Sequence, residues 1–182
     1  MNRIDADRYS TEKSNSDLVQ SSSTFLIFFS QPVEEQVKKK ISMELISVGS
    51  AEFPESNTHV DTLNEEYRKD GGNSCKLIAI ADRQISPDVI QAQAERPVFD
   101  SMVLINPEFR AGLAGKFHLL EIPVLIITSA LLDWNVRSQA TSYHDLISGS
   151  EMIIVRSSAT NPLLELRSQV FNAIIKFEKN AI

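Results

Sequence analysis

The chain has 182 residues, of which 42% are hydrophobic, and its formal net charge is −6 at pH 7. This size and composition predict one globular domain with a single core. The acidic balance excludes the basic footprint of proteins that bind nucleic acid or anionic membranes, and no apolar run approaches the roughly 20 residues that span a bilayer.

The first segment, residues 1–23, is polar and carries charges of both signs, without the apolar core of a secretory signal. We expect a flexible tail here, followed by one domain over residues 24–182. The single cysteine, Cys75, falls in an apolar run and has no second cysteine to pair with in a disulfide. This is compatible with a reducing compartment, and we expect a cytoplasmic, soluble protein.

Six short runs rich in β-branched and aromatic residues predict strands that are buried on both faces. In chain order they are residues 24–29 (TFLIFF), 43–48 (MELISV), 76–81 (KLIAIA), 101–106 (SMVLIN), 123–128 (PVLIIT) and 151–156 (EMIIVR).

Apolar residues at helical spacing follow the predicted strands. The stripes are Val33, Val37 and Ile41; Val60, Leu63 and Tyr67; Val136, Ala140, Tyr143 and Ile147; and Leu163, Leu166, Val170 and Ile174. Proline suits the first helical position, which predicts helix starts at Pro32, Pro87 and Pro162, with Ser86 and Asn161 as N-caps. Because alternating strands and helices need crossover connections, the fold class is α/β, a three-layer sandwich around a mainly parallel sheet of about six strands.

Ligands of such sheets bind beyond the carboxyl ends of the strands, so the residues after each strand are the candidates for a site. These segments hold the carboxylates Asp82, Glu108 and Asp133, the base Arg83 and several hydroxyls, with no histidine. No glycine-rich phosphate loop joins a strand to a helix, and we predict no cofactor and no metal.

From about Phe99 to the C-terminus, the segments FDSMVLINPEF, LLEIPVLIITSALLDWNV and EMIIVRSSATNPLLELRSQVFNAIIKF resemble, in order and spacing, the C-terminal half of an α/β-hydrolase. The likeness extends more loosely back to Thr24. It implies an α/β-hydrolase-like sheet that lacks the family's first antiparallel strands, because the polar tail cannot supply them. It also implies a lidless domain, because only residues 107–121 separate two predicted strands where the family inserts its lid.

In that family a serine, a carboxylate and a histidine act as one catalytic unit. The resemblance puts Asp133 at the position of the triad acid and Thr160 where the family has histidine. The nucleophile corner corresponds to KLIAIADRQ, where one register puts Ala81 and the other puts Asp82 at the serine position. Neither register supplies a serine, and threonine cannot act as a general base near neutral pH.

Two alternatives follow for the carboxylates. Asp82 resembles the aspartate nucleophile of the haloalkane dehalogenase branch, which also needs a histidine to activate water. None of His59, His118 and His144 stands where that histidine belongs. The other alternative is structural, with Asp82 at a helix N-terminus and Asp133 as a helix cap.

We therefore hypothesise an α/β-hydrolase-like protein without the triad serine and histidine, a pseudoenzyme that serves as a binding or protein-interaction module. Its ligand-binding candidates are Ser30, Asp82, Asp133 and Trp134. The alternative is an active hydrolase, esterase-like or with Asp82 as nucleophile, on a small ester or acyl compound. The partner is a small molecule or a protein that the sequence does not name, and a homo-oligomer stays open.

Overall fold

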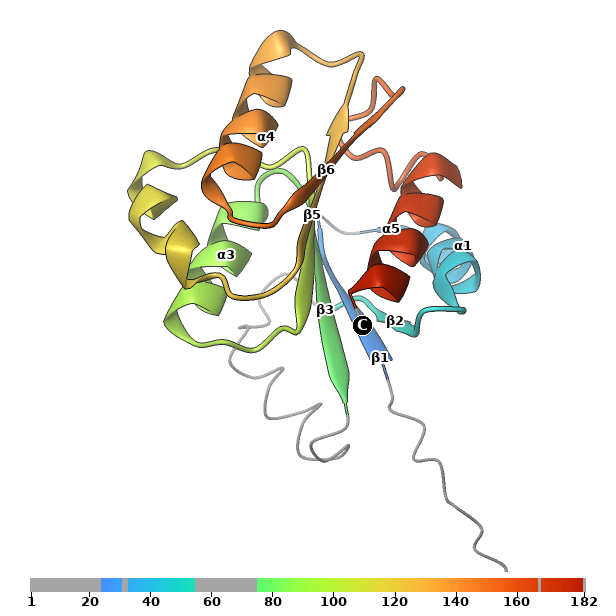
Figure 1. Ribbon diagram of the computed structural model, residues 1–182. Helices are drawn as coiled ribbons and strands as arrows, with labels where there is room; N and C mark the ends of the chain where they lie inside the picture. Colours follow the sequence, from blue (N-terminus) through green and yellow to red (C-terminus); the bar gives the residue numbers. More distant parts are fainter. Residues whose placement is uncertain (1–23, 31–32, 55–74, 167, 182) are drawn as a thin grey trace, which may run out of the picture.

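The computed structural model describes residues 24–30, 33–54, 75–166 and 168–181, which form a central sheet with helices on both sides (Figure 1). The predicted tail, the predicted stripe at residues 60–67, His59 and the predicted start at Pro32 lie outside the described residues. No helix within the described ranges is long and apolar enough to cross a membrane.

All strand pairs of the described sheet are parallel, in the order β2-β1-β3-β4-β5-β6. The strands are β1 (Thr24–Phe29), β2 (Ser50–Glu52), β3 (Lys76–Ala81), β4 (Ser101–Ile105), β5 (Val124–Ser129) and β6 (Glu151–Val155). The chain runs from β1 to β2 on one side and then returns to β3 on the other side of β1. This reversal makes the carboxyl ends of β1 and β3 the switch point at which such sheets bind ligands.

Helices cover both faces of the sheet and complete the predicted three layers. They are α1 (Glu35–Leu45), α3 (Ser86–Glu95), the 3-10 helix η2 (Ala111–Leu119), α4 (Trp134–Leu146) and α5 (Ser168–Asn180). Helices α1 and α5 lie on one face, and α3 and α4 lie on the other (Figure 1). The connection from β4 to β5 contains η2 and no lid, as predicted.

The long apolar runs follow from burial on both faces, because alternate residues of a strand point to opposite layers. On β3, Leu77, Ala79 and Ala81 belong to the core under α3 and α4, whereas Ile78 and Ile80 belong to the core under α1 and α5. The predicted stripe at Val136, Ala140, Tyr143 and Ile147 is buried, and its last three residues belong to the first of these cores.

The predicted strand at residues 43–48 is wrong. Helix α1 continues to Leu45, and the strand that pairs with β1 is Ser50–Glu52. The reason is helical periodicity, since Ile41 and Leu45 stand four residues apart and are both fully buried, while Met43 and Ile46 are exposed. A short apolar run at the end of a helix thus looks like a buried strand.

Two predicted helix starts also need correction. Helix α3 begins at Ser86, whose hydroxyl donates to the Asp82 and Ala81 carbonyl oxygens at 2.6 Å and 3.2 Å, so Ser86 is the first helical residue and not the N-cap. Helix α5 begins at Ser168 and not at Pro162. Asn161 instead caps a turn, because its Oδ1 accepts a hydrogen bond of 3.1 Å from the Leu163 N–H. Leu166 ends that turn with a left-handed φ of 56°, which a continuing helix cannot include.

Candidate functional site

A pocket of about 300 Å³ opens at the carboxyl edge of the sheet, beside the switch point. Three loops contribute its lining. The described lining residues are Asp82, Arg83 and Gln84 after β3, Glu108 after β4, and Thr160, Asn161 and Leu164 after β6. The pocket lies at the edge of the sheet where the strand-end rule predicts a ligand site.

The corner between β3 and α3 is held by backbone hydrogen bonds. The Asp82 N–H donates to the Phe29 carbonyl at 3.0 Å, and the Ser86 N–H donates to the Asp82 carbonyl at 2.8 Å. The Glu108 N–H donates to the Arg83 carbonyl at 3.1 Å, which joins this corner to the loop after β4. The corner is thus tied to β1, α3 and the β4 loop.

This corner differs from the nucleophile elbow of serine hydrolases, which is a sharp and strained turn directly from strand to helix. Four residues, 82–85, separate β3 from α3. Among the described non-glycine residues, only Asn106 and Leu166 have a positive φ, so the backbone at Ala81 and Asp82 is not strained in this way. Of the two registers, Ala81 is fully buried in the core, and Asp82 lines the pocket.

Asn106, which the sequence did not single out, organises the opposite wall. Its side chain is fully buried, and its Nδ2 donates to the Thr160 carbonyl at 2.7 Å and to Ser129 Oγ at 3.0 Å. Its Oδ1 accepts from the Ser129 N–H at 2.8 Å, and Ser129 Oγ donates to the Ala159 carbonyl at 3.1 Å. Asn106 thereby joins the ends of β4 and β5 to the loop that follows β6. Its φ of 47° suits asparagine, and the only sequence signal was an asparagine before proline at a strand end.

Two side chains in the pocket keep donors available. Arg83 is part-buried, and its guanidinium forms no hydrogen bond or ion pair with any described residue. Asn161 is 9% exposed, and its Oδ1 is occupied by the Leu163 N–H. Within the described part of the chain, its Nδ2 has no hydrogen-bond partner. The pocket thus combines free donors with the carboxylates of Asp82 and Glu108.

The other predicted ligand-binding residues are not among the described residues that line this pocket. Asp133 is the N-cap of α4, where its Oδ1 accepts a hydrogen bond of 3.1 Å from the Asn135 N–H. Trp134 is the first residue of α4 and is 71% exposed. Ser30 directly follows β1. The structure therefore brings Asp82 and Thr160 to one pocket and gives Asp133 a capping role.

The two described histidines are far from the pocket in the topology. His118 is exposed near the end of η2, the segment that returns to the amino end of β5. His144 lies in the last turn of α4, and its Nδ1 is 2.9 Å from the Oγ of Ser150, which directly precedes β6. The pocket, as far as its described residues go, holds no imidazole. The described residues also contain no group of three or more His, Cys, Asp or Glu that could hold a metal ion.

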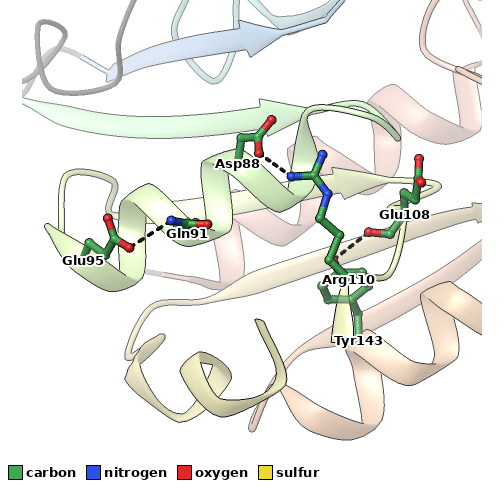
Figure 2. A network of polar contacts seen from close by, with 6 residues as sticks. All are labelled: Asp88, Gln91, Glu95, Glu108, Arg110 and Tyr143. Atoms are coloured by element: carbon green, nitrogen blue, oxygen red, sulfur yellow. Dashed lines mark hydrogen bonds and ion pairs between the residues drawn. The ribbon is translucent and has the colours of Figure 1, made fainter. Parts of the chain in front are cut away.

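A buried tyrosine forms a hydrogen bond to the backbone of the pocket residue Glu108. The Tyr143 hydroxyl donates to the Glu108 backbone carbonyl at 2.8 Å, and Figure 2 shows the Glu108 carboxylate directed away from the Tyr143 ring. Burial raises the pKa of Tyr143 from 10.0 to about 12, which keeps the hydroxyl protonated as a donor. Arg110 and Asp88 form an exposed ion pair at 2.6 Å next to it, and exposed pairs of this kind contribute little stability.

Comparisons with known proteins establish the fold. No family model matches the sequence, and no curated protein is similar to it. Among solved structures, the chain is similar to a predicted CIB-like hydrolase from Thermoplasma acidophilum, with a TM-score of 0.70, 15% identity and 88% of each chain covered.

Two further solved structures have a fold similar to that of this chain. One is an alpha-beta serine hydrolase homologue from Coxiella burnetii, with a TM-score of 0.64, 13% identity, and coverage of 83% of this chain and 84% of that one. The other is an enol-lactonase from Burkholderia xenovorans, with a TM-score of 0.64, 8% identity, and coverage of 86% and 91%. The chain has the α/β-hydrolase fold, as the sequence resemblance implied. Identities this low show the fold alone.

Proposed function

We propose that this α/β-hydrolase-fold protein is a non-catalytic binding module, and that the pocket at Asp82, Arg83, Glu108 and Asn161 is its ligand site. The observation that carries the proposal is the chemistry of the described pocket, which offers carboxylates, a cation, amides and a hydroxyl, but no imidazole. A serine nucleophile needs a base to remove its proton, and an aspartate nucleophile needs one to activate water. Binding requires neither.

The geometry of the corner and of the opposite wall supports the same proposal. A nucleophile at position 81 would have its side chain in the core, because Ala81 is fully buried. Thr160 stands where the family histidine is expected, and its carbonyl is engaged by Asn106 at 2.7 Å. Its hydroxyl can form hydrogen bonds to a ligand but cannot act as a general base near neutral pH.

The second candidate is an active hydrolase on a small ester or acyl compound. One observation favours it, namely that Asp82 lines the pocket directly after β3, at the strand-to-helix corner where this fold carries its nucleophile. This candidate requires a base that the described pocket residues do not supply.

Ester hydrolysis separates the two candidates. We would measure release of p-nitrophenol from its acetate and butyrate esters by the purified full chain, beside Asp82→Asn and Asp133→Asn. The proposal predicts that all three proteins give the rate of the uncatalysed reaction. Saturable turnover that falls at least about 1000-fold in Asp82→Asn would establish the hydrolase instead.

A further inference from the structure

The charges of the pocket restrict what it can bind. Arg83 brings a guanidinium that has no partner among the described residues, and a part-buried guanidinium favours a carboxylate, which it can hold through two parallel hydrogen bonds. An anionic group of the ligand is therefore expected at Arg83.

A second, independent feature points to an acceptor on the ligand. Asn161 lines the pocket, and 9% of its surface is exposed. Its Nδ2 donates a hydrogen bond to no described residue. Among the described residues, the Asn161 Nδ2 is not one of the fully buried side-chain atoms that lack a hydrogen bond, so it is accessible and can donate to a ligand in the pocket. A carboxylate oxygen of a ligand would satisfy this donor.

A simple anion fits the rest of the pocket poorly. Asp82 and Glu108 are carboxylates on the β3 and β4 sides of the same space, and they disfavour a second negative charge. A protonated amine would instead donate to them. The volume of about 300 Å³ lies at the lower end of the roughly 300–1,000 Å³ usual for ligand pockets, so the ligand is small.

We propose that the pocket binds a small amino carboxylate, a molecule with a carboxylate and a protonated amine a few bonds apart. The carboxylate lies at Arg83 and the Asn161 Nδ2, and the ammonium lies between Asp82 and Glu108. This inference rests on the proposed binding function and specifies its ligand class.

The test uses three molecules of one skeleton length, β-alanine, propionate and propylamine, together with the longer 5-aminopentanoate. Binding to the ¹⁵N-labelled full chain is followed by amide chemical shifts at pH 7. At least one amino carboxylate should bind at least tenfold more tightly than propionate and propylamine, with the largest shifts at residues 82–84, 108 and 160–161.

Variants then assign each charge. Arg83→Gln and Glu108→Gln should each weaken binding of the amino carboxylate at least tenfold, and Arg83→Lys should weaken it less than Arg83→Gln does. The exposed Arg137 and Glu121 supply matched controls, and Arg137→Gln and Glu121→Gln should leave binding unchanged. The amide spectrum of each variant reports whether it is folded.

Three results would overturn the ligand class. Propionate binding as tightly as β-alanine would indicate a plain anion site, and propylamine doing so would indicate a cation site. Absence of shifts at the pocket with every probe at 20 mM would exclude small amino carboxylates. None of these results decides the proposed non-catalytic function, which the ester assay tests by itself.

Discussion

Asn106 shows at the scale of one residue how the site is built. A single buried amide forms hydrogen bonds to Ser129 at the end of β5 and to the Thr160 carbonyl in the loop after β6. The bond to the Thr160 carbonyl holds the backbone of the loop after β6. The family resemblance implied a catalytic histidine in this loop. The sequence could not reveal this role, because the bonds join positions 23 and 54 residues apart.

Replacing Asn106 by alanine should therefore destabilise the whole domain. The change leaves the buried Ser129 N–H and the Thr160 carbonyl without their partner, and it places alanine at a φ of 47°. We expect a loss of about 2–4 kcal/mol in the free energy of unfolding, measured by urea denaturation. The exposed Asn135→Ala serves as the control, with an expected change within about 0.5 kcal/mol. Equal stability of the two variants would show that the amide network is not important.

Tyr143 gives a prediction for alkaline pH. Its folded pKa, about 12, lies above the ordinary value of 10.0, so the stability that the protonated hydroxyl contributes is complete below pH 10 and is lost as pH rises through 12. Tyr143→Phe removes the bond to the Glu108 carbonyl and should cost about 1 kcal/mol at pH 7. The stability difference between wild type and variant should shrink from pH 10 to 12. Denaturation curves that keep the same difference over this range would contradict the assignment.

At the scale of elements, the strands that the sequence predicted best are those buried on both faces. The predicted bounds of β1 and β3 are confirmed, because each is a short apolar run of strand length that ends directly at polar residues. The three-residue edge strand β2 was missed, because the more apolar run before it belongs to α1. The sequence predicts Asn161 as a helix cap, and its side chain caps a turn instead, because an asparagine that accepts a hydrogen bond from the N–H two residues on has the same local sequence pattern in both cases.

Helix α5 is anchored by a buried ion pair at the amino edge of the sheet. Glu178 is 4% exposed, accepts a hydrogen bond of 2.7 Å from Ser101 Oγ, and forms an ion pair of 2.8 Å with Lys76 Nζ at the start of β3. Lys76→Met would leave the carboxylate buried without its cation. We expect a loss of about 2–4 kcal/mol in unfolding free energy, measured by urea denaturation.

The more exposed pair of Lys116 and Glu95, at 2.6 Å, provides the comparison. Lys116→Met should change the free energy of unfolding by no more than about 1 kcal/mol. If Lys76→Met were as mild as Lys116→Met, the ion pair at Glu178 would not be what holds α5 to the sheet.

At the scale of the whole molecule, the alternation of strands and helices was enough to predict a parallel three-layer α/β fold, and the strand-end rule was enough to locate the pocket. Asp82 and Thr160 were predicted at this edge and lie there together. The sequence could not indicate that the third loop brings Asn161 and Leu164 to the same space, because this depends on how the chain turns before α5. The fold is thus shared with hydrolases, while the described residues of the pocket include no histidine.

Single-turnover ester hydrolysis, with the protein in large excess over p-nitrophenyl acetate, shows most directly whether the pocket is catalytic. Under these conditions even very slow catalysis by the pocket appears as a first-order rate constant. For a non-catalytic pocket, we expect the same constant for wild type and Asp82→Asn at every protein concentration. A wild-type constant that saturates with protein concentration and exceeds that of Asp82→Asn would contradict this expectation and identify a working hydrolase.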